Sequence, residues 1–101
     1  MVKLYKTDKR FNLYRYGFDC YVEFKIEDWY GFNLYKKYCR DKLGPELCVV
    51  AGHVYGDANW RSVACYQNRR WRSKRIYLRG EKYYTLLSLA MPLESKETIY
   101  L

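Results

Sequence analysis

The chain has 101 residues, is 50% hydrophobic and 30% charged, and contains only two prolines. This composition excludes a disordered tail and fits a single domain over residues 1–101. Nineteen Lys and Arg against 11 Asp and Glu give a net charge of +8, which favours phosphate-bearing partners or acidic protein surfaces. No apolar run reaches the ~20 residues of a membrane span, and residues 1–10 lack the apolar stretch of a signal peptide. We therefore expect a cytoplasmic protein that does not contact a membrane.

The first quarter of the chain predicts strands. Val2–Thr7 reads as a short strand, and Phe11–Tyr16 as a second strand that pairs back on it and ends at Gly17. Cys20–Ile26 has the clearest strand pattern, because apolar and polar residues alternate along it. One face of this strand is expected to be buried, with Cys20, Val22, Phe24 and Ile26 on it.

A helix is predicted from about Asp28 to Leu43. Asp28 can cap its N-terminus, and Gly44-Pro45 supplies a glycine and a proline that stop it. At helical spacing, apolar side chains gather on one side of this segment and polar ones on the other. The polar side carries a secondary basic patch of Lys36, Lys37 and Arg40.

Four further strands are expected after the helix. Leu47–Tyr55 begins with a continuous apolar run, which is typical of a central strand. Trp60–Tyr66 and Trp71–Leu78 form a hairpin around Asn68-Arg69, and Tyr83–Ala90 is the last long strand. The tail Leu93–Leu101 either frays or adds a short edge strand at its end.

The predicted order is therefore β-β-β-α-β-β-β-β. One amphipathic helix and one sheet with an apolar face can cover each other, so the fold class is α+β, with a single helix packed on a curved, mainly antiparallel sheet. Exposed edge strands such as Val2–Thr7 or Tyr83–Ala90 leave a homodimer open as an alternative.

The hairpin is the most unusual part of the sequence, because residues 58–80 contain no Asp or Glu. Cations interleaved with aromatic residues are typical of surfaces that hold phosphates and stack on bases. The predicted nucleic-acid contacts are Arg61, Arg69, Arg70, Arg72, Lys74 and Arg75, with Trp71 as the stacking candidate.

The register of this hairpin leaves two interpretations open. A tight turn places Tyr66 opposite Trp71 and Trp60 opposite Tyr77, so all four aromatic side chains share one face. That face is either the core under the helix or an exposed platform for a nucleic acid or a protein.

No catalytic or metal site is predicted. The four cysteines (Cys20, Cys39, Cys48 and Cys65) lack the close pairs that zinc sites use, and they are interpreted as buried thiols, with disulfides left open. His53 is the only histidine, and no spacing pairs it with a nucleophile. The acidic residues are dispersed and the glycines are isolated, so neither a two-metal nuclease site nor a phosphate loop is indicated, and no cofactor is expected.

These observations favour a small, non-enzymatic, basic protein that binds RNA or DNA through the backbone, with aromatic stacking and low sequence specificity. The alternative is a protein–protein interaction module, for example a small viral or phage accessory factor that blocks or redirects a host complex. In that case the same aromatic and arginine surface would contact an acidic protein surface. A small enzyme also remains open.

Overall fold

The computed structural model describes residues 3–67 and 69–90. Its elements, in chain order, are β1 (Leu4–Lys6), a 3-10 turn (Tyr14–Tyr16), β2 (Cys20–Lys25), α1 (Trp29–Leu43), β3 (Cys48–Val50), β4 (His53–Tyr55), β5 (Trp60–Gln67), β6 (Arg70–Leu78) and α2 (Glu81–Ala90). The α+β class is confirmed.

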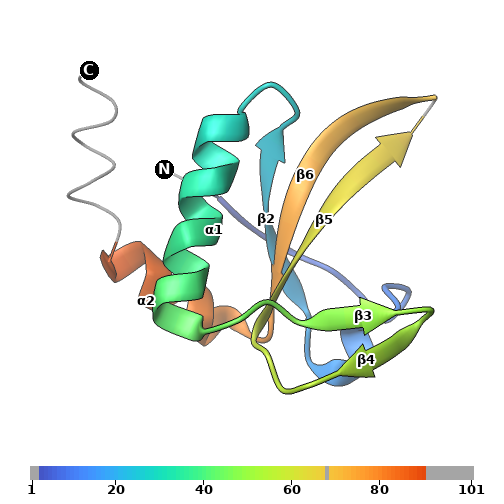
Figure 1. The fold of residues 1–101 in the computed structure, drawn as a ribbon, viewed down its shortest axis with the longest axis vertical. Coiled ribbons are helices and arrows are strands. Elements are labelled where there is room, and N and C mark those ends of the chain that lie inside the picture. Colours follow the sequence, from blue (N-terminus) through green and yellow to red (C-terminus); the bar gives the residue numbers. More distant parts are fainter. Residues whose placement is uncertain (1–2, 68, 91–101) are drawn as a thin grey trace.

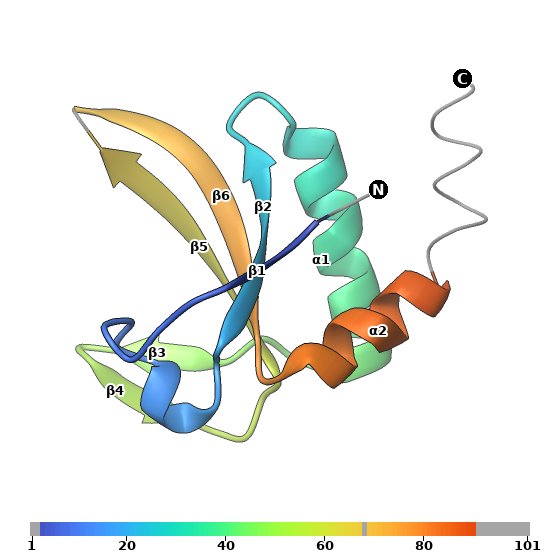
Figure 2. The same cartoon turned by 180° about the vertical axis from the view of Figure 1, so that it is seen from behind.

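The main sheet is antiparallel and has the strand order β1-β2-β6-β5. Strand β6 is central, with β5 on one side and β2, which precedes α1 in the chain, on the other. Figure 1 shows α1 and α2 beside one face of this sheet, while the end of the β5–β6 hairpin curves away from α1. In the opposite view, β1 crosses in front of β2 (Figure 2).

Helix α1 forms where the sequence predicts it. The Asp28 carboxylate accepts a hydrogen bond from the Gly31 amide at 3.0 Å and caps the first turn. Gly44, with φ of 89°, ends the helix, and its amide donates to the Arg40 carbonyl at 3.2 Å. The buried side chains of α1 are Phe32, Tyr35, Tyr38 and Cys39.

The larger core lies between the helices and the sheet. Alternation along β2 buries Cys20, Val22 and Phe24 there, as expected from its pattern. Trp60, with 0% exposure, fills the space under α1, and its indole Nε1–H donates to the Gly44 carbonyl at 2.8 Å. The complete buried cluster is Cys20, Val22, Phe24, Phe32, Tyr35, Tyr38, Cys39, Trp60, Ile76, Leu78 and Leu87.

A second, smaller core covers the opposite face of the sheet near the hairpin root. Tyr77 is its centre on β6, and Phe11 stacks on that ring at a centroid distance of 4.0 Å. The loop before β2 and the β3–β4 hairpin supply the cover (Figures 1 and 2). The buried members are Leu13, Phe18, Leu47, Ala58 and Tyr77.

The prediction of a single helix is wrong, because Tyr83–Ala90 belongs to α2 and is not a strand. Leu87 is fully buried in the larger core, and Tyr83 and Tyr84 pack against the same cluster. These three residues are spaced by three and four, which is the helical period. The tail Leu93–Leu101 lies outside the described residues.

Two other strand predictions are also wrong. Phe11–Tyr16 does not pair with β1, because the Asp8 carboxylate accepts from the Arg10 amide at 3.0 Å and starts a turn there. Leu47–Tyr55 is not one central strand but the hairpin of β3 and β4. Ala51 and Gly52, with φ of 50° and 79°, make the two-residue turn that splits it.

The β5–β6 hairpin is confirmed, but most of its predicted register is not. Tyr66 does lie opposite Trp71, and then the ladder shifts by one residue between Cys65 and Tyr66. Trp60 therefore pairs with Leu78, and Tyr77 pairs with Arg61. The shift separates Trp60 and Tyr77 onto opposite faces, into the two cores. Asn68 and the Tyr66 side chain lie outside what the structure describes.

The two hairpin tryptophans should differ sharply in their contribution to stability. Trp60→Phe removes a buried donor and part of a buried ring, so it should lower the free energy of unfolding by about 2 kcal/mol. Trp71, with 54% exposure, is the matched control, and Trp71→Phe should cost less than about 1 kcal/mol. Urea unfolding at equilibrium measures both, and equal costs would contradict this assignment of the core.

Candidate nucleic-acid interface

The cations at the root of the β5–β6 hairpin are engaged by acids from other parts of the chain. The Arg75 guanidinium donates to the Glu23 carboxylate at 2.7 Å and to the Tyr77 hydroxyl at 3.2 Å, and it lies 4.3 Å from the Tyr21 ring centroid. Burial by itself lowers the pKa of Arg75, but the hydrogen bonds with Tyr77 and Glu23 raise it above its usual value. Arg75 therefore joins β6 to β2.

Arg61 has a similar position on β5. Its guanidinium donates to the Leu47 carbonyl at 3.2 Å and lies 3.7 Å from the Glu46 carboxylate. The same carboxylate accepts from the Ser62 amide and hydroxyl at 2.8 and 2.6 Å. Arg61 thus ties the segment after α1 to the edge of the sheet, and we assign it a structural role.

The cations farther from the root are not neutralised in this way. Arg69, Arg70 and Arg72 are exposed, and Arg69 sits in the turn with φ of 64°. Six cations at this end of the molecule form no ion pair within the part of the chain that the structure describes. We call this set the basic end, and it consists of Lys25, Lys36, Arg69, Arg70, Arg72 and Lys74.

Phe32 joins the helix to the hairpin within the basic end. The Lys74 Nζ, on β6, lies 4.9 Å from the centroid of the Phe32 ring, and the Lys36 Nζ, on α1, lies 5.4 Å from it. Both ammonium groups therefore lie beside one aromatic ring. Lys36 and Lys74, which are far apart in the sequence, are thus brought close together by the fold.

The other two members of the predicted helix patch lie in different positions. Arg40 is one turn beyond Lys36, and its guanidinium lies 5.9 Å from the Trp60 ring centroid, at the root of the hairpin. Lys37 is exposed and is rotated by about 100° around the helix axis from Lys36. We therefore do not include Lys37 in the basic end.

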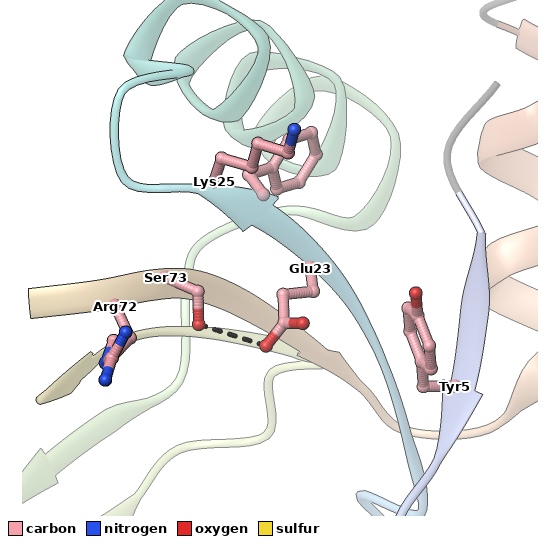
Figure 3. Close-up of a pocket in the computed structure, with 6 residues that line it drawn as sticks. Tyr5, Glu23, Lys25, Arg72 and Ser73 are labelled. Carbon is pink, nitrogen blue, oxygen red and sulfur yellow. Dashed lines mark hydrogen bonds between the residues drawn. The ribbon is translucent and has the colours of Figure 1, made fainter. Parts of the chain in front are cut away.

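A pocket of about 290 Å³ opens on the sheet beside the basic end. Figure 3 shows Glu23 between Tyr5 on β1 and Ser73 on β6, with Lys25 and Arg72 farther along their strands. The Glu23 carboxylate accepts from the Ser73 hydroxyl at 3.0 Å and also from Arg75, so its charge is balanced internally. The two cations that line the pocket, Lys25 and Arg72, have no acidic ion-pair partner among the described residues.

The serine that lines this pocket has no free base beside it. A serine nucleophile needs a base that is free to take its proton. The carboxylate next to Ser73 is held by Arg75, and His53 lies on β4, in the other sheet. No group of three or more His, Cys, Asp or Glu side chains among the described residues is placed to hold a metal ion.

The cysteines divide by burial. Cys20 and Cys39 are buried, whereas Cys48 is exposed and Cys65 is half-buried, so only two match the expectation of buried thiols. Burial, followed by Asp19, raises the pKa of Cys20 to about 11, and burial, followed by Glu46, raises the pKa of Cys39 to about 12. Both of these thiols stay protonated at neutral pH and are poor nucleophiles.

Sequence reasoning missed Lys25, Glu23 and Glu46. Glu23 is 52 residues from Arg75, and the β2–β6 register brings them together. Since β2 and β6 are not consecutive strands, no spacing in the sequence signals this contact.

Comparison with protein-family models, with curated proteins and with solved structures finds no match for this chain. Neither α1 nor α2, the helices of the described residues, has the length and apolar character needed to cross a membrane.

The structural role of Arg75 predicts a specific energetic pattern. Arg75→Met leaves the half-buried Glu23 carboxylate without its cation, so it should lower the free energy of unfolding by about 1–2 kcal/mol. Arg72→Met, at an exposed position three residues before Arg75 on the same strand, should cost less than about 0.5 kcal/mol.

A double-mutant cycle provides the control. Glu23→Gln should destabilise the Arg75→Met variant less than it destabilises the unmodified protein, because the pair is already broken. Additive costs in urea unfolding would show that Glu23 and Arg75 do not interact.

Proposed function

We propose that the protein binds nucleic acid through the basic end, mainly by contacts to backbone phosphates. The observation that carries this proposal is the placement of Lys36 and Lys74 beside the same Phe32 ring, which makes one cationic surface from α1 and the hairpin. Arg69, Arg70 and Arg72 extend that surface to the hairpin turn. Phosphate-binding proteins use clusters of cations that are not neutralised internally, because each phosphate contact releases condensed counterions.

The distribution of acids supports the same proposal. Glu23, Glu46 and Asp57 pair with Arg75, Arg61 and Arg79 at or near the hairpin root. The outer cations keep their charge available for a partner. Trp71, which is 54% exposed, is the stacking candidate on the hairpin. Base edges are not read by such a surface, so sequence specificity should be low.

An acidic protein surface is the alternative partner, and it is favoured by the exposed apolar side chains of α2. Leu86 and Leu89 are 43% and 77% exposed. Exposed apolar side chains that lie close together are typical of protein interfaces. Recovery of a partner from lysate that persists after nuclease treatment would favour this second function.

Removal of the outer arginines should abolish most of the binding. The variant Arg69→Ala/Arg70→Ala/Arg72→Ala should bind a labelled oligonucleotide at least tenfold more weakly at ~50 mM salt. The slope of the logarithm of the binding constant against the logarithm of the salt concentration should fall in magnitude by about two to three, because three phosphate contacts are lost. Fluorescence anisotropy at ~50 and ~200 mM salt measures both quantities.

The matched control removes the same charge elsewhere. Lys9→Ala/Lys42→Ala/Lys82→Ala neutralises three exposed lysines that lie outside the basic end. This variant should bind within about threefold of the unmodified protein, because only long-range attraction is lost. Equal losses in both variants would mean that net charge, and not the basic end, determines binding.

A further inference from the structure

Two neighbouring aromatic side chains on the first turn of α1 are exposed without a role in the core. Trp29 is 62% exposed and is the most exposed aromatic side chain of the described residues, and Tyr30 is 54% exposed. Their rings are perpendicular, at 87°, with centroids 6.3 Å apart. Large aromatic side chains are usually buried, and when several are exposed together they mark a surface that contacts a partner.

The helix places Trp29 next to the basic end. Trp29 lies one turn before Phe32, whose ring lies beside Lys36 and Lys74, and two turns before Lys36. The Asp28 amide donates to the Lys25 carbonyl at 3.0 Å, so the end of β2 leads directly into this first turn. The aromatic pair therefore borders the cations on the side of α1.

We propose that Trp29 and Tyr30 stack on bases and that the ligand of the basic end is single-stranded nucleic acid. This inference rests on the proposed function. In a duplex the faces of the bases are covered by their neighbours, whereas a single strand presents them to flat side chains. Cations that hold the backbone beside exposed rings that hold the bases are the combination that single-strand binding uses.

The cations beside the rings also decide the chemistry of the partner. An apolar peptide would cover Trp29 and Tyr30 but would leave Lys25, Lys36 and Lys74 unpaired next to it. A strand of nucleic acid supplies an anion at every residue together with a planar base. Its charge and its shape therefore both complement this surface.

The experiment uses the tryptophans as reporters. In the Trp71→Phe variant, the remaining tryptophans are Trp29, which is exposed, and Trp60, which is fully buried. Titration with a 20-nucleotide oligothymidine at ~50 mM salt should quench the exposed tryptophan as bases stack on it. A duplex of equal length should bind without comparable quenching.

Affinity measurements give the second readout. Trp29→Ala should weaken binding of the single strand at least fivefold and should change binding of the duplex less than twofold. Trp29→Phe should restore most of the affinity, because a smaller ring still stacks. Tyr55→Ala, at a 55% exposed position on β4, is the matched control and should have no effect.

The outcomes separate this inference from the proposed function. Equal binding of single strand and duplex, with no quenching and no effect of Trp29→Ala, would overturn the inference while leaving the proposed function standing. No binding of either oligonucleotide at ~50 mM salt would overturn both, because the phosphate contacts themselves would be missing. Capture of a protein at Trp29 in place of a single strand would also overturn the inference.

Discussion

The structure depends on the burial of three consecutive residues of β6. Ile76 and Leu78 point into the larger core, and Tyr77 between them points into the smaller one. A strand buried on both faces, with neighbours on both edges, cannot slide without exposing apolar groups on one side. This constraint fixes the root of the hairpin, and it explains why ion pairs from Glu23 and Glu46 also gather there. Beyond Ser73 the hairpin has no β2 partner, and there the exposed cations begin.

The separation of root and outer end accounts for the surface chemistry. Where the hairpin packs on both faces, its arginines are held by acids or aromatic rings, as Arg75 is held by Glu23 and Tyr21. Where it projects beyond Ser73, its cations form no ion pair among the described residues, because residues 58–80 contain no acid and β2 no longer runs alongside to supply one. The arginines of β6 therefore differ in their surroundings, because Arg75 is paired near the root whereas Arg70 and Arg72 form no ion pair among the described residues.

Sequence patterns predicted the parts of the fold that are set locally. The cap at Asp28, the stop at Gly44 and the alternation from Cys20 to Phe24 were all read correctly, since neighbouring residues determine them. Three features of the fold were not predicted from the sequence. The turn at Ala51-Gly52 lacks the usual Asn-Gly signal, α2 resembles a strand because its residues are aromatic and aliphatic, and the one-residue shift at Cys65 depends on packing across the whole sheet. The candidate site was predicted only in part. The sequence shows the cations along the hairpin, but it does not show that Lys74 of the hairpin lies close to Lys36 of α1.

The central claim is that α1 and the hairpin act as one binding surface through Phe32. Mapping amide chemical shifts by NMR during titration with a short oligonucleotide tests it most directly. The claim predicts that signals shift together in residues 29–36 of α1 and 70–74 of β6, with little change in β3 and β4. Shifts confined to the hairpin, or centred on α2 near Leu86 and Leu89, would contradict it.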